Sequence, residues 1–203
     1  MAMTNQPTET MQSPLHNAVL GRSNAAVAGI RMCEYKFYGH LNLRGDPAKE
    51  AFLSAVRMVL GLVLPSAPCS RVRNDTATVH WLGPNEWLLL VTPGHELQIE
   101  ADLRAVLVGQ HAAVVDISSA QMLVNLSGTK LPELLQKSTV YDCDSAYLPV
   151  GKVVQTTFAK TIATLCRCED GSIDLIIRRS FADYFMLWLQ DTSAEYGLAV
   201  VDP

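Results

Sequence analysis

The stretch WLGPNEWLLLV, from Trp81 to Val91, carries the clearest folding signal in the chain. Its turn residues, Gly83-Pro84-Asn85, stand between two runs of aromatic and branched apolar residues that favour strands. The stretch therefore predicts a β-hairpin. One strand is expected from Thr76 to Leu82 and the other from Glu86 to Thr92.

The segments around the hairpin alternate between strand and helix patterns. Before it we expect a strand over Glu34–Leu43, then a helix that starts at Asp46-Pro47 and ends at Gly61. After it we expect a helix over Glu96–Val108 and a strand over Ala112–Ile117. The resulting order, β-α-β-β-α-β, is that of a ferredoxin-like unit.

The second half of the chain repeats this theme. Its expected elements are strands Gln121–Leu126, Val153–Phe158, Thr161–Arg167 and Ile173–Arg178, and helices Thr129–Lys137 and Phe181–Leu189, the last capped by Ser180. The predicted fold class is α+β, with two ferredoxin-like halves packed as one unit. We expect a disordered segment over residues 1–14 and one pseudo-duplicated domain over 15–203, divided into about 30–118 and 119–203.

Composition restricts the functional class. The chain has 203 residues, of which 49% are hydrophobic and 18% are charged, and this is typical of a packed globular core. A net charge of −4 without a basic run argues against nucleic acid as a partner. No apolar run reaches the length of a transmembrane helix or a signal peptide, so we expect a cytoplasmic protein without a membrane partner.

Five cysteines are present, and Cys166 and Cys168 form a C-x-C on an expected strand. Free thiols in a reducing cytosol are the simplest interpretation. A zinc site usually needs four ligands, so the pair would need help from His40 or His80. No metal site is predicted.

Asp116 ends a buried strand in the sequence VVDISSAQM. A carboxylate in this place can anchor a ligand amine or act as a base. It can also cap a turn through Ser118 and Ser119, as aspartate commonly does. We treat Asp116 as a candidate vestigial ligand site and leave both readings open.

A second group of residues makes candidate contacts with a partner. Arg178 and Arg179 precede the final helix, where they can bind an anion, pair with a partner subunit or form solvated ion pairs. Trp87, Phe185 and Trp188 are expected partner anchors if their side chains are exposed, and core residues otherwise. No nucleotide-binding glycine loop, metal motif or Ser-His-Asp arrangement occurs in the sequence, so no catalytic or cofactor-binding residue is predicted.

Three segments carry a resemblance to a known family: LGPNEW (Leu82–Trp87), VVDISSAQMLVNLSG (Val114–Gly128) and RRSFADY (Arg178–Tyr184). The chain resembles the gamma subunit of heterotetrameric sarcosine oxidase over nearly its whole length. Members of that family are similar in fold to a truncated glycine-cleavage T-protein, a folate-binding aminomethyltransferase. One departure is Ser119-Ala120-Gln121, where the family often has a polar or basic pair.

The resemblance implies a non-catalytic subunit of an oxidoreductase. The complex would demethylate sarcosine to glycine, with hydrogen peroxide and formaldehyde or methylene-tetrahydrofolate as the other products. FAD, FMN, NAD and zinc would belong to the alpha, beta and delta subunits, with tetrahydrofolate as co-substrate. This chain would pack on the alpha subunit, stabilise it and carry no cofactor.

Two other functions remain as alternatives. One is a stand-alone folate-dependent enzyme of the aminomethyltransferase type, in which Asp116 would hold the ligand. The other is a regulatory module that binds a small molecule, an interpretation that rests on fold analogy.

Overall fold

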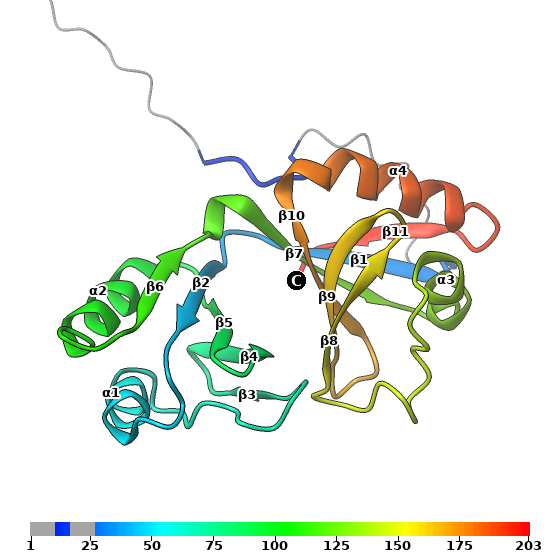
Figure 1. The fold of residues 1–203 in the computed structure, drawn as a ribbon. Coiled ribbons are helices and arrows are strands. Elements are labelled where there is room, and N and C mark those ends of the chain that lie inside the picture. Colours follow the sequence, from blue (N-terminus) through cyan, green and yellow to red (C-terminus); the bar gives the residue numbers. More distant parts are fainter. Residues whose placement is uncertain (1–10, 17–26) are drawn as a thin grey trace, which may run out of the picture.

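The computed structural model describes residues 11–16 and 27–203. They form two β-sheets that face each other, with two helices on the outer face of each (Figure 1). The predicted α+β fold is confirmed. No helix among the described residues is both long enough and apolar enough to cross a membrane.

The N-terminal sheet has five strands in the order β3–β4–β5–β2–β6. Their bounds are Arg71–Arg73, Ala77–Gly83, Glu86–Val91, Gly39–Arg44 and Ala113–Asp116. Helices α1 (Glu50–Leu60) and α2 (Glu96–Val106) cover its outer face and enclose a core that includes Trp87. Leaving the short β3 aside, this is the predicted ferredoxin-like unit.

The C-terminal sheet has six strands in the order β11–β1–β7–β10–β9–β8. Their bounds are Leu198–Val201, Ile30–Tyr35, Gln121–Ser127, Ile173–Arg178, Thr161–Arg167 and Val153–Phe158. Helices α3 (Leu131–Ser138) and α4 (Ala182–Thr192) cover its outer face. Strand β1 lies between β7 and β11, pairing antiparallel with the first and parallel with the second.

The predicted single strand over Glu34–Leu43 is wrong. The segment forms the end of β1 and most of β2, which belong to different sheets. The break falls at Phe37, whose φ of 61° is in the left-handed region. The chain changes direction there as it passes from β1 of the C-terminal sheet to β2 of the N-terminal sheet.

Two predicted helix starts are also wrong. Helix α4 follows a 3-10 turn, η2 (Arg179–Phe181), and no side-chain hydrogen bond caps it, so Ser180 does not form the predicted capping box. Helix α1 begins at Glu50. The Asp46 carboxylate instead accepts a hydrogen bond from the backbone N–H of Ala48 at 2.9 Å, which makes a turn before the helix.

The two sheets meet through apolar and polar contacts. Leu88 and Leu90 of β5 pack with Leu123 of β7 and Ile176 of β10. At one edge, Ser70 forms a β-bridge with Lys152. The sheets are therefore joined through their core as well as by the chain.

Residues 1–10, most of the segment expected to be disordered, lie outside the described residues. The next six, Met11–His16, form what we call the N-terminal strap. Within it Ser13 and Leu15 are buried and both hydrogen-bond to the Glu34 carboxylate. The N-terminal strap is therefore packed against β1 through Ser13 and Leu15.

Candidate functional site

Asp116 lies at the end of β6 with an exposed side chain. Its Oδ1 accepts hydrogen bonds from the backbone N–H and the hydroxyl of Ser118, at 2.8 and 2.5 Å. The Ser118 hydroxyl oxygen also accepts a hydrogen bond from the backbone N–H of His40 at 2.9 Å. Asp116 thus makes a turn through Ser118, which is one of the two readings left open by the sequence, and this turn is tied to the start of β2.

A cleft opens beside this turn, where the two sheets and the N-terminal strap meet. We call it the junction cleft, and its volume is ≈ 340 Å³. Its wall includes both Asp116 and the buried His40. His40 Nδ1 lies 2.9 Å from the side-chain oxygen of Gln121, and burial lowers the pKa of the imidazole.

The predicted apolar anchors do not lie on the surface. Trp87 and Phe185 are each 1% exposed, so the expectation that they form exposed partner anchors is wrong. Trp188 is half-buried, and its indole N–H donates to the Ser138 hydroxyl at 3.0 Å. Large aromatic side chains on α4 therefore stabilise the C-terminal core.

Arg178 and Arg179 are exposed, as a role at an interface requires. Arg179 donates to the backbone carbonyl of Gln12 in the strap at 3.3 Å. Both residues also line a broad surface hollow next to the start of α4, together with Asp183. Contact of Arg178 and Arg179 with a partner remains a proposal.

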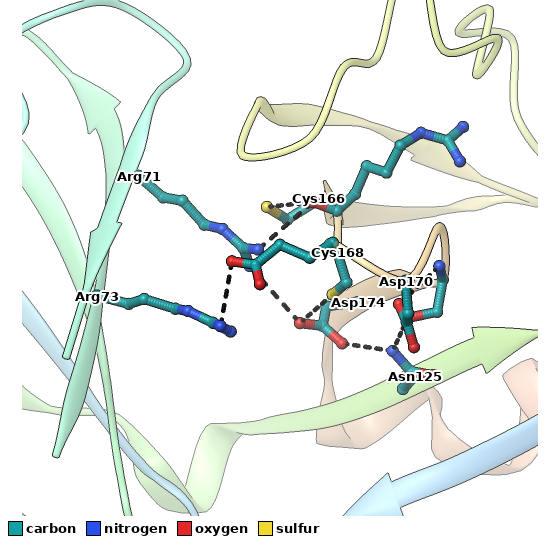
Figure 2. Close-up of polar contacts among 10 residues, drawn as sticks. Arg71, Arg73, Asn125, Cys166, Cys168, Asp170 and Asp174 are labelled. Carbon is teal, nitrogen blue, oxygen red and sulfur yellow. Dashed lines mark hydrogen bonds and ion pairs between the residues drawn. The ribbon is translucent and has the colours of Figure 1, made fainter. Parts of the chain in front are cut away.

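A polar cluster between the sheets was missed by sequence reasoning. Figure 2 shows Arg71 and Arg73 reaching from the N-terminal sheet toward Cys166 and Asp174 of the other sheet and toward Cys168 in the turn after β9. Arg71 Nη1 lies 3.9 Å from Asp174 Oδ2, and the Arg71 side chain is only 7% exposed. The same carboxylate accepts hydrogen bonds from Cys168 Sγ at 3.1 Å and from the Asn125 side chain at 2.8 Å.

All five cysteines are free thiols. Burial raises the pKa of Cys166 to about 12 and that of Cys168 to about 11, so both stay protonated near neutral pH. A protonated thiol is a poor nucleophile and a poor metal ligand. Among the described residues, no group of three or more histidine, cysteine or acidic side chains is placed to hold a metal ion.

His80 of β4 is 1% exposed, and neither ring nitrogen has a hydrogen-bond partner. Burial, assisted by the nearby Arg71, lowers its pKa to about 3. The folded protein therefore holds a neutral imidazole, whereas His80 of the unfolded chain takes up a proton below its ordinary pKa of 6.5. This linkage makes the folded state less stable as the pH falls from the unfolded pKa toward the folded one.

We expect a His80→Leu variant to lack that part of the acid sensitivity. Between about pH 7 and pH 5, wild-type protein should lose about 2 kcal/mol of unfolding free energy relative to the variant. Urea unfolding at each pH measures this difference. If the unfolding free energies of both proteins fell equally with pH, proton uptake by His80 on unfolding would not be the cause of the acid sensitivity.

Comparisons with known proteins agree with this architecture. A family model described as "Sarcosine oxidase, gamma subunit family" matches residues 44–195. Sarcosine oxidase subunit gamma of Corynebacterium sp. (strain P-1) is 28% identical over 194 residues, which cover 95% of this chain and 94% of the relative. Sarcosine oxidase subunit gamma of Arthrobacter sp. is 27% identical over 199 residues, which cover 97% of this chain and 96% of the relative.

Solved structures show the same fold. One chain of heterotetrameric sarcosine oxidase from Corynebacterium sp. U-96, in complex with pyrrole 2-carboxylate, superposes with a TM-score of 0.80 at 24% identity. The match covers 94% of this chain and 98% of that one. Glycine cleavage system aminomethyltransferase T from Bartonella henselae gives a TM-score of 0.60 at 14% identity, covering 86% of this chain but 48% of the other.

Proposed function

The chain belongs to the sarcosine oxidase gamma subunit family, and on that premise we propose that it is the gamma subunit of a heterotetrameric sarcosine oxidase. The observation that carries the proposal is the family match over residues 44–195. Nearly full-length similarity to a gamma subunit, at 28% identity, supports it further. The proposed activity of the complex is oxidative demethylation of sarcosine to glycine, with hydrogen peroxide and formaldehyde or methylene-tetrahydrofolate as products.

In this proposal the chain supports a catalyst that other subunits contain. Its sequence has no glycine-rich phosphate loop for a flavin or nicotinamide dinucleotide. Raised pKa values at Cys143, Cys166 and Cys168, all caused mainly by burial, disfavour thiolate chemistry. As the family resemblance implies, we propose that FAD, FMN, NAD and zinc belong to the alpha, beta and delta subunits.

The experiment that tests this role is a pull-down of the tagged full-length chain from its native host. We expect larger flavin-bearing subunits to co-elute and the eluate to produce peroxide when sarcosine is added. Mass spectrometry and an absorbance scan identify the partners and the flavin. A lone, colourless chain would contradict the subunit role, and a tetrahydrofolate-induced rise in melting temperature would then favour a folate enzyme.

Contact with the alpha subunit is proposed for the surface that begins at Arg178 and Arg179. Exposed apolar side chains continue this surface along η2 and α4, at Phe181 and Leu187. A mixture of exposed arginine and apolar residues is common at protein interfaces. This composition supports the start of α4 as a contact surface.

Reversing both charges, Arg178→Glu with Arg179→Glu, should weaken co-elution of the other subunits at least about tenfold, because like charges across an interface repel. The melting temperature of the chain should hardly change, since both side chains are exposed. A matched reversal of two exposed basic residues on other elements, Arg57 of α1 and Lys160 of the β8–β9 turn, serves as the control. Equal co-elution of the two double variants would exclude this surface.

A further inference from the structure

The junction cleft has the size and lining of a small-molecule site. Its volume of ≈ 340 Å³ is within the range of ligand pockets in proteins. The strap, the β1–β2 turn, and the turn that follows β6 all contribute to its wall. The wall therefore combines segments that are far apart in the sequence and held together by the fold.

Glu34 is the most informative residue in this wall. Its side chain is buried, with the residue 6% exposed, and it accepts hydrogen bonds from the Ser13 hydroxyl at 2.8 Å and the Leu15 backbone N–H at 3.2 Å. None of the ion pairs formed by residues 11–16 and 27–203 involves Glu34. Buried carboxylates are normally paired with a cation, and Glu34 has no such counterion among these described residues.

The other buried or half-buried groups of the wall also suit a cation. His40 is neutral near pH 7 because burial lowers its pKa. Its Nδ1 lies 2.9 Å from the side-chain oxygen of Gln121, and in the tautomer that donates to this oxygen Nε2 is an acceptor. Positive charge in the wall comes only from Lys36 and Arg179, whose side chains are exposed.

Aromatic rings supply the apolar part of the wall. Tyr35 and Tyr38 lie with their ring centroids 5.8 Å apart and tilted by 59°. Burial raises the pKa of Tyr35 to about 12, so its ring remains a neutral phenol. Faces of neutral aromatic rings attract ammonium ions, most strongly where water is excluded.

We propose that the junction cleft binds a small organic ammonium ion, with the carboxylates of Glu34 and Asp116 supplying the charge and the Tyr35–Tyr38 pair the aromatic surface. Asp116 fits this role because it lines the cleft while its turn fixes the carboxylate through Ser118. The bound ammonium ion would thus serve as the counterion of the Glu34 carboxylate. Arg179 lies both in the cleft wall and at the start of the proposed contact surface, but the cation site does not depend on the subunit role.

Binding is tested with tetramethylammonium chloride and the full-length chain, measured by ligand-observed NMR against sodium chloride at equal ionic strength. We expect saturable binding with a Kd on the order of 1 mM. Glu34→Gln should weaken it at least about tenfold. The glutamine can still accept from Leu15 and donate to Ser13, so the strap keeps both of its hydrogen bonds.

Two further variants keep the proposal testable if Glu34→Gln does not fold. Asp116→Asn preserves the turn oxygen but removes the charge, and Tyr38→Leu preserves apolar volume but removes the ring; each should weaken binding. Asp142→Asn is the matched control, because Asp142 makes the same kind of turn, to the backbone N–H of Asp144, away from the cleft. Unchanged affinity in the three cleft variants, or no binding above the sodium control at about 10 mM, would overturn the proposal.

Discussion

The Trp87→Ala variant is expected to lose about 3–5 kcal/mol of unfolding free energy. Trp87 packs against Phe52 of α1, with ring centroids 5.8 Å apart, and its indole N–H donates to the backbone carbonyl of Pro65 at 2.9 Å. Alanine would leave a cavity under α1 and a buried carbonyl without a partner, and both effects destabilise the folded state. Urea unfolding followed by circular dichroism gives the size of the loss.

Two other variants separate these effects from a general sensitivity to substitution. Trp87→Phe retains a ring but not the N–H, so its loss should be smaller than that of the alanine variant. Leu187→Ala removes a side chain that is 66% exposed and should change the unfolding free energy by no more than about 0.5 kcal/mol. If Trp87→Ala and Leu187→Ala behaved alike, Trp87 would not be a core residue in solution.

Local sequence patterns were sufficient to predict much of the fold. The expected strands Val153–Phe158, Thr161–Arg167 and Ile173–Arg178 have the observed bounds of β8, β9 and β10. Gly61 ends α1 with a φ of 64°, as its position after the helical pattern predicted. Such signals are local because a turn or a period-2 alternation is set by a few neighbouring residues.

Features that depend on contacts between distant segments were missed. Strand β3 is only three residues long and has no apolar alternation, and β11 is bound by a strand far away in the sequence. Aromatic residues at helical or strand spacing show that one side is apolar, but not whether that side faces the core or a partner. For this reason the sequence left Trp87 and Phe185 open between partner anchor and core residue, and the structure places both in the core.

The polar cluster between the sheets is the clearest case of a missed site. Asp174 is a single acidic residue inside the apolar strand IDLIIR, and that was the one available signal. Its partner Arg71 lies 103 positions earlier (174 − 71), on a strand that was not predicted. Only packing of the two sheets brings these side chains together.

Removing the Asp174 carboxylate should therefore destabilise the protein strongly. In Asp174→Ala, the guanidinium of Arg71 keeps its buried place without the carboxylate beside it, and Asn125 and Cys168 lose an acceptor. Breaking a buried pair in this way costs about 3–5 kcal/mol, most of it from the uncompensated charge. The loss is measured by urea unfolding at neutral pH.

A double-mutant cycle distinguishes this cause from loss of packing. If the isolated charge dominates, Arg71→Met combined with Asp174→Ala should be more stable than Asp174→Ala alone. Additive losses would instead mean that Arg71 and Asp174 do not interact. Arg73→Ala is the control: its pair with Glu169, at 3.1 Å, has side chains 54% and 68% exposed and should contribute no more than about 1 kcal/mol. Because Arg71 and Asp174 belong to different sheets, a coupling confined to this pair would show that the polar cluster helps the two halves to fold as one unit.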